Sequence, residues 1–265
     1  MTETYSPRHG CRQVERIHVY QDLPFSRFIP FVMICLLMKR GFFVRWYRAQ
    51  GRAYPWRSAA TSSFQVLITE ILLHQTRAND VLRVWEKLFA KYPDPISLAQ
   101  SSPKALNKLL EELGFGIWRT RALRLVAQYL LDFYGGRVPN ERAKLLEIPF
   151  VGPYTAGAVM AFSFQRREAI VDTNVLRLFS RYFGKTFGND IRRTQEPWDI
   201  ARKLLPTRAH QVAAHNYGIL DFTAEICRPI RPKCEMCPLN RSCNFGLLEG
   251  YEPKRGSTVS SQNSE

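Results

Sequence analysis

The chain has 265 residues, enough for one large or two small domains, and 45% of them are hydrophobic, enough to bury a sizeable core. The formal net charge of +15 favours a polyanionic partner over a surface that is charged only for solubility. The apolar run at residues 28–38 has 11 residues, too few to cross a bilayer, so we expect no membrane span.

The two ends of the chain lack the helical apolar pattern of its middle. No small-residue cleavage site follows the apolar run, which argues against a signal peptide. An amphipathic helix, FFVRWYRAQ, begins shortly after Met38. We therefore expect residues 1–37 to be a poorly ordered or non-native extension, with Met38 as the start of the functional chain. Residues 246–265 are expected to form a flexible tail, because residues 250–265 are Ser-rich and lack apolar anchors.

Apolar residues recur at intervals of three and four through most of the remaining chain, which predicts helices. There is no convincing alternation with a period of two, and no internal repeat, so the sequence predicts an all-α fold. The helices expected after the first one cover residues 64–76, 81–89, 97–100, 103–113, 121–133, 142–148, 153–162, 175–182, 192–205 and 209–225.

A tight hairpin is expected in the middle of the chain. The helix at 142–148 ends at Pro149, and Phe150, Val151 and Gly152 then form the turn. Pro153 suits the first turn of the following helix, where its missing N–H costs nothing. Free backbone N–H groups at a helix start suit a phosphate, so Val151 and Gly152 are candidate phosphate contacts.

Asp172 lies between apolar Val171 and the helix expected at 175–182, where an aspartate commonly serves as a helix N-cap. By position alone, capping is the more common explanation. A phosphate-binding hairpin just upstream, however, would bring a nucleic-acid backbone to the same place. A carboxylate there can stabilise the positive charge that builds on a sugar when a nucleoside C1′–N bond breaks, and it can orient a water.

The helix-hairpin-helix followed by V-D-x-N-V resembles the endonuclease III superfamily of DNA glycosylases, and most closely its adenine and thymine mismatch branches. The P-W-R turn at residues 55–57 is also similar to that superfamily. The resemblance covers about residues 38–245. It implies that Asp172 is the catalytic carboxylate and that Asn174 matches the asparagine found in both mismatch branches.

Four of the six cysteines fall within residues 227–243, which favours a metal centre in a reducing compartment over a disulfide framework. A zinc site usually has two close pairs of ligands, and here only one close pair is present. The spacing C-x6-C-x2-C-x5-C suits a [4Fe–4S] cluster and matches the iron–sulfur loop of the superfamily. The expected ligands are Cys227, Cys234, Cys237 and Cys243.

Basic residues occupy the loop between the first two of these cysteines. Arg228, Arg231 and Lys233 could simply be a solvated face of the loop. Because a cluster would fix the loop at both ends, we interpret them instead as phosphate contacts.

Two further residues are candidates for catalysis. Glu70 lies within an apolar helix, where a carboxylate is rarely buried without a partner or a task. Burial raises a carboxyl pKa and allows proton donation, and Glu70 matches a glutamate of the mismatch branches. Tyr154 stands where bifunctional relatives have the lysine that forms a Schiff base. Tyrosine cannot form an imine, so the resemblance implies base removal without strand cleavage.

Gln75 and Phe115 match the two residues that the superfamily inserts into DNA. A flipped nucleotide leaves a gap that needs a polar plug and an apolar wedge. Phe115 lies between two glycines, as suits an exposed loop tip, although ordinary packing would account equally for either residue.

The sequence departs from the family pattern at three positions. Phe150 replaces the first glycine of the L-P-G-V-G hairpin, which is awkward if that position needs a positive φ and predicts one fewer phosphate contact. Thr173 follows the aspartate where adenine glycosylases usually have glycine, and His74 replaces a glutamine common in that branch.

We therefore expect an all-α, two-part glycosylase fold with a helix-hairpin-helix and a C-terminal iron–sulfur loop. One part is a helical barrel of residues 60–165. The other joins residues 38–59 to residues 166–245 and carries the cluster. The active site is expected in the cleft between them.

The expected function is monofunctional excision of thymine or uracil opposite guanine, by a cytoplasmic, nucleoid-associated monomer acting on double-stranded DNA. Adenine glycosylases usually carry a further C-terminal domain, and this sequence ends soon after Cys243, which favours the thymine branch. An adenine glycosylase acting opposite guanine or 8-oxoguanine is the alternative. A non-catalytic iron–sulfur DNA-binding protein is a more distant one.

Overall fold

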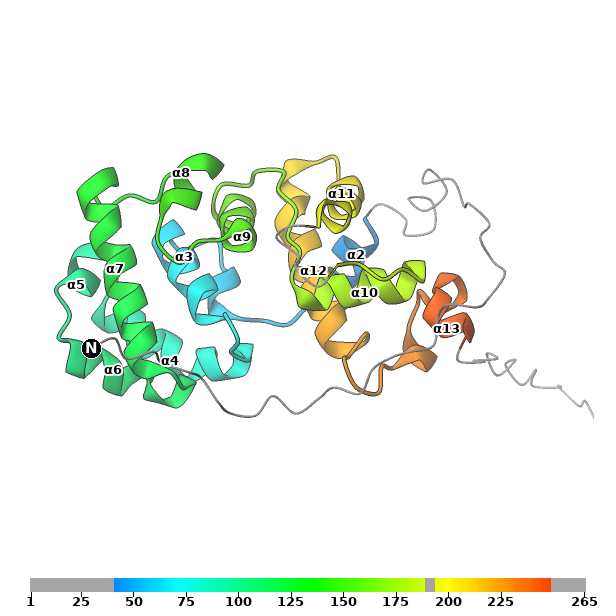
Figure 1. Cartoon of the computed structure of the whole chain (residues 1–265), viewed down its shortest axis with the longest axis horizontal. Helices are drawn as coiled ribbons and strands as arrows, with labels where there is room; N and C mark the ends of the chain where they lie inside the picture. Colours follow the sequence, from blue (N-terminus) through cyan, green and yellow to red (C-terminus); the bar gives the residue numbers. More distant parts are fainter. Residues whose placement is uncertain (1–40, 189–193, 249–265) are drawn as a thin grey trace, which may run out of the picture.

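The computed structural model describes residues 41–188 and 194–248. Within these ranges the chain is helical and contains no strand, which confirms the all-α prediction (Figure 1). None of the helices found there combines the length and the apolar character that crossing a bilayer requires. The expectations for residues 1–37, Met38 and most of the C-terminal tail lie outside the described residues.

Capping explains several helix boundaries. Ser62 and Gln65 form a capping box, so the helix expected from residue 64 begins one residue earlier. Phe115, in a left-handed conformation, precedes a helix that starts five residues before the expected one. The helices are α2 (Phe42–Gln50), α3 (Ser63–Leu72), α4 (Ala78–Lys91), α5 (Pro95–Ala99), α6 (Pro103–Leu110), α7 (Gly116–Tyr134), α8 (Arg142–Glu147), α9 (Pro153–Ser163), α10 (Thr173–Phe183), α11 (Gln195–Leu204), α12 (Val212–Glu225) and α13 (Asn244–Leu248).

Short 3₁₀ turns connect these helices. The helix expected at 103–113 ends at Leu110 and continues as the 3₁₀ turn η2 (Glu111–Leu113), and the one expected at 209–225 starts as η3 (Ala209–Gln211). Three more turns lie in the connecting segments: η1 (Pro55–Arg57), η4 (Cys234–Met236) and η5 (Asn240–Ser242).

Buried apolar side chains form two clusters. The first surrounds α3, whose Leu67, Ile68 and Leu72 are fully buried, and includes α4, α6, α7 and α9. Tyr54 and Trp56 also pack in this cluster, although they lie in the segment that was expected to join the second part. These helices occupy one half of the molecule in Figure 1.

The second cluster joins α2 to helices from the C-terminal half of the described residues. Phe43 and Trp46 of α2 pack with Phe222 of α12 and with the apolar faces of α10 and α11. Gly218 permits the close approach of α12 to α2, because an added Cβ would collide with the Phe43 carbonyl oxygen. Figure 1 shows α2, α10 and α12 together, with α13 beyond them.

Candidate active site and cysteine loop

Glu70 lies on α3 and is only 3% exposed. Its Oε2 has no hydrogen-bond partner among the described residues. Burial raises the pKa of Glu70 to about 7, against the opposing positive charge of Arg57. A carboxyl group with this pKa can hold and release a proton near neutrality, as a general acid must.

Tyr154, in the first turn of α9, faces this carboxyl group. Its hydroxyl hydrogen-bonds Glu70 and thereby lowers the carboxyl pKa, although less than burial raises it. Burial and the nearby charges of Glu70 and Asp172 raise the pKa of Tyr154 well above its ordinary value, so the hydroxyl keeps its proton. The phenol is therefore a hydrogen-bond donor in the site, and it offers no amine.

Asp172 and Asn174 form one hydrogen-bonded unit at the start of α10. Asp172 Oδ1 accepts from the Val175 N–H at 2.7 Å, so the residue is an N-cap. Asp172 Oδ2 accepts from Asn174 Nδ2 at 2.7 Å. The negative charge of Asp172 raises the pKa of Glu70, which shows that the two carboxyl groups interact electrostatically. Capping and a role in the site are thus compatible.

Arg177 extends this unit toward the cysteine loop. Its Nη1 donates to Asn174 Oδ1 at 2.9 Å, and its Nη2 donates to the Cys227 carbonyl at 3.0 Å. The orientation of Asn174 against Asp172 therefore depends on a side chain held by the first cysteine of the loop. Sequence reasoning missed Arg177, although its place one turn after Asn174 was a usable signal.

Sequence reasoning also missed a charged cluster behind Glu70. Asp221 on α12 is fully buried and accepts from Arg57 at 2.7 and 2.9 Å and from Arg52 at 2.8 Å. The Arg57 guanidinium lies 4.4 Å from the Tyr217 ring centroid. Asp221 neutralises Arg57, so Arg57 lowers the Glu70 pKa without itself being an unpaired buried charge. The only signals in the sequence were the P-W-R turn and one aspartate in an apolar helix.

The hairpin adopts a left-handed turn at Phe150, with φ of 64°. This is the positive φ that makes a bulky residue costly there. The Phe150 ring packs edge-on against Trp118, with centroids 5.4 Å apart, and this contact offsets part of the cost. The Val151 side chain is buried and its N–H donates to the Ile148 carbonyl, while Gly152 caps α9 with open space beside it.

Gln75 and Phe115 occupy two exposed loop tips. Both have a positive φ, 55° for Gln75 and 51° for Phe115, and Phe115 is 72% exposed. They line the same cavity of about 520 Å³, together with His74, Trp118 and Arg119. The two candidate insertion residues thus lie on either side of one opening.

The cysteine loop surrounds a small cavity beside α10. The cavity is lined by all four candidate ligands, Cys227, Cys234, Cys237 and Cys243. Burial, with a smaller contribution from the neighbouring thiols, raises the pKa of Cys237 to about 12. As placed, no group of three or more His, Cys, Asp or Glu side chains within residues 41–188 and 194–248 is arranged to hold an ion. Four cysteine thiols that line one cavity suit an iron–sulfur cluster, although they do not lie in a ligating arrangement.

The basic residues of this loop differ in exposure, and Lys233 lines the same cavity as the four cysteines. Arg231 is exposed and has a φ of 50°, while Arg228 and Lys233 are half-buried. Arg181 donates to the carbonyls of Arg228 and Pro229, so α10 holds the backbone from which these residues project.

Comparison with known proteins agrees with this geometry. Residues 68–198 match the family model for the HhH-GPD superfamily base excision DNA repair protein. A thymine/uracil-DNA glycosylase of Methanothermobacter thermautotrophicus is 35% identical over 75% of this chain and 89% of its own length. A thymine-DNA glycosylase of Aeropyrum pernix is 33% identical over 76% of this chain and 91% of its own.

Endonuclease III and adenine DNA glycosylases are also among the relatives that match. Among solved structures, a thermostable thymine-DNA glycosylase superposes with a TM-score of 0.72 at 33% identity, covering 78% of this chain and 94% of that one. The helical fold, the hairpin before α9 and these similarities lead to one conclusion: the chain belongs to the HhH-GPD superfamily of base excision DNA repair proteins.

Proposed function

We propose that this protein is a monofunctional DNA glycosylase that removes thymine or uracil opposite guanine. The observation that carries the proposal is the pairing of Glu70, whose pKa burial raises to about 7, with an Asp172 whose two oxygens each accept a hydrogen bond. Two relatives at 35% and 33% identity, which are named thymine/uracil- and thymine-DNA glycosylases, support the choice of base.

Asp172 is proposed to stabilise the sugar cation. Breaking the C1′–N bond leaves positive charge on the sugar, and a carboxylate fixed beside it lowers the barrier. The N–H of Val175 and the amide of Asn174 orient the Asp172 carboxylate before substrate arrives. The same carboxylate can align the water that completes hydrolysis.

Glu70 is proposed to assist departure of the base from the other wall of the site. In its neutral form it can donate a hydrogen bond or proton to a base oxygen or nitrogen as negative charge develops there. The Tyr154 hydroxyl orients this carboxyl group. Because Tyr154 provides no amine, no Schiff base with the sugar forms at this position and the strand stays intact.

DNA is proposed to lie across both parts of the protein. The barrel part would supply the hairpin through Gly152, since the Val151 N–H is already bonded to the Ile148 carbonyl, and the insertion residues Gln75 and Phe115. The other part, which includes α2 and α10–α13, would supply Arg228, Arg231 and Lys233 as phosphate contacts. The net charge of +15 supports a polyanionic partner of this extent.

A panel of duplexes tests this function. Duplexes carrying G·T, G·U, G·A or 8-oxoguanine·A are incubated with enzyme, and products are divided between neutral and alkaline work-up. We expect excision from G·T and G·U, with strand breaks appearing only after alkali. Preferred excision of adenine would favour the alternative supported by the adenine glycosylase relatives. Strand breaks at neutral pH would contradict the monofunctional assignment, and release of no base would contradict the enzyme itself.

The cysteine loop is proposed to hold a [4Fe–4S] cluster on Cys227, Cys234, Cys237 and Cys243. Its task here is structural: few apolar side chains of this loop are buried, so bonds to the cluster would supply its stability. Anaerobically purified protein should contain about four irons per chain. Iron and zinc measured together on one sample decide the point, since stoichiometric zinc without iron would exclude the cluster.

A further inference from the structure

Arg119 lies on α7 beneath the two loop tips and is only 2% exposed. Its Nε donates to the Gly114 carbonyl at 2.9 Å. Its Nη1 donates to the Leu72 carbonyl at 3.1 Å, and its Nη2 donates to the His74 carbonyl at 3.3 Å and to Thr76 Oγ1 at 2.6 Å. One guanidinium therefore joins the loop after α3 to the loop before α7.

These bonds act directly on Gln75 and Phe115, the two loop-tip residues whose backbone is left-handed. The His74 carbonyl belongs to the peptide that precedes Gln75, and the Gly114 carbonyl belongs to the peptide that precedes Phe115. A left-handed conformation is costly for a side-chain-bearing residue and persists only where the surroundings enforce it. At both tips, a hydrogen bond from Arg119 holds the peptide that precedes the left-handed residue.

The charge of Arg119 has no carboxylate partner among the described residues. Burial lowers the pKa of Arg119, which shows that its environment disfavours a cation. Loop carbonyls and one hydroxyl are what stabilise it, so the arginine and the two loop conformations depend on each other. Lysine would keep the charge but lacks the planar fork that reaches four acceptors at once.

Above Arg119 lies the cavity of about 520 Å³ whose walls include Gln75, Phe115 and Trp118. Both tips line it, and its exposed aromatic side chains, Phe115 and Trp118, can stack on a nucleobase. We infer that Arg119 is a positioning residue that sets the spacing of the two insertion loops, so that this cavity receives the base left unpaired opposite the flipped nucleotide. The inference rests on the proposed function.

The test is Arg119→Lys, with excision of uracil measured in single-turnover experiments on two duplexes. In one, uracil lies opposite guanine; in the other, it lies opposite an abasic-site analogue, which leaves no unpaired base to accommodate. We expect excision from the G·U duplex to fall about 10- to 100-fold, because small misplacements of positioning groups have effects of this size. Excision opposite the abasic analogue should fall less than about 3-fold, since Glu70 and Asp172 are untouched.

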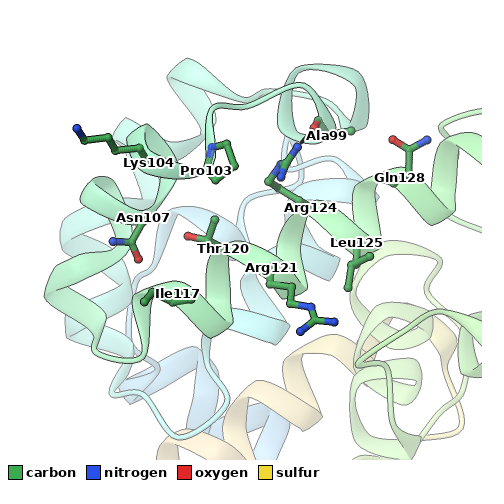
Figure 2. Close-up of a pocket in the computed structure, with 10 residues that line it drawn as sticks. All are labelled: Ala99, Pro103, Lys104, Asn107, Ile117, Thr120, Arg121, Arg124, Leu125 and Gln128. Atoms are coloured by element: carbon green, nitrogen blue, oxygen red, sulfur yellow. Dashed lines mark hydrogen bonds between the residues drawn. The ribbon is translucent and has the colours of Figure 1, made fainter.

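Two further variants separate positioning from loss of fold. Arg124→Lys is the matched control on the same helix, since its guanidinium donates to the Ala99 carbonyl on another face of α7, beside a different cavity (Figure 2). It should leave both rates unchanged. Thr76→Val removes one bond to Arg119 and the bond from Thr76 Oγ1 to the His74 carbonyl, and it should shift the two rates in the same direction as Arg119→Lys, by a smaller factor.

An equal loss on both duplexes would overturn the inference, as would no loss on either. A fluorescent base analogue beside the mismatch provides a readout that does not need turnover. Its signal on binding should rise with the wild type and with Arg124→Lys, and rise less with Arg119→Lys at equal protein saturation. If the wild type released no base from any duplex, the proposed function would fail, and the fluorescence comparison would still decide the role of Arg119.

Discussion

Asp172→Asn should reduce base excision by a hundred- to a thousandfold while leaving fold and DNA binding intact. The loss of one fixed electrostatic contact to a charged transition state lowers the rate by about this factor. Asparagine is as good an N-cap as aspartate, so the bond from the Val175 N–H to the side chain can persist and α10 should not unravel. Single-turnover excision from a G·T or G·U duplex is the measurement, with affinity measured alongside.

Asp199→Asn provides the control for the added positive charge. Asp199 lies on the solvent-facing side of α11, where its half-exposed side chain pairs with Arg202 at 2.7 Å. Both variants should bind DNA equally well, and only Asp172→Asn should lose turnover. Full activity in Asp172→Asn would remove the proposed catalytic carboxylate, and loss of binding would show that the residue acts only through the structure of α10.

Glu70→Gln should stabilise the protein at alkaline pH while slowing the reaction. The Glu70 pKa rises from 4.5 to about 7 on folding, a difference of about 3 kcal/mol. Below pH 4.5 the carboxyl group is protonated in both folded and unfolded states, and it costs nothing. As pH rises from 4.5 toward 7, Glu70 ionises in the unfolded state before it ionises in the folded state. The free energy of unfolding of the wild type therefore falls, and that of the glutamine variant does not. Chemical denaturation at pH 5 and pH 8 should therefore show the larger gain at pH 8.

Glu70→Gln should lower the rate of base excision even though it raises the stability of the fold. If neutral Glu70 donates to the leaving base, wild-type excision should decline as pH rises through about 7, and the variant should be slower and lack this dependence. Glu86→Gln, at an exposed position of α4, is the control and should alter neither property. A variant that is stabilised but keeps the wild-type pH profile would leave Glu70 as a buried structural residue without a proton-transfer role.

Sequence alone could identify those parts of the site that depend on local patterns. The apolar helix around Glu70, the hairpin before Pro153 and the spacing of the cysteines are each contained within a short stretch of chain. The hairpin pattern also predicts that Phe150 stands in an unfavourable position, and the structure places it at a φ of 64°. The all-helical fold followed from the three- and four-residue periodicity for the same reason.

Residues whose partners lie far along the chain could not be found this way. Arg57 and Asp221 are 164 residues apart, and Arg177 and Cys227 are 50 apart. Arg119 looks like any arginine on a basic helix, and only the folded structure brings it to carbonyls 45 and 47 residues upstream. Side-chain-to-backbone bonds of this kind carry no compositional signature, because every residue offers a carbonyl.

The packing of α2 against α12 has a consequence for how the protein is made. Phe43 and Trp46 leave the ribosome early, but Phe222, which packs against both, is synthesised about 180 residues later. At roughly 5–20 residues per second, α2 waits on the order of 10–30 s with its aromatic face exposed to solvent. The first cluster can condense during that interval. In truncated chains that stop before α12, the first cluster should therefore be folded while the aromatic face of α2 stays exposed. Such chains should bind chaperones through α2.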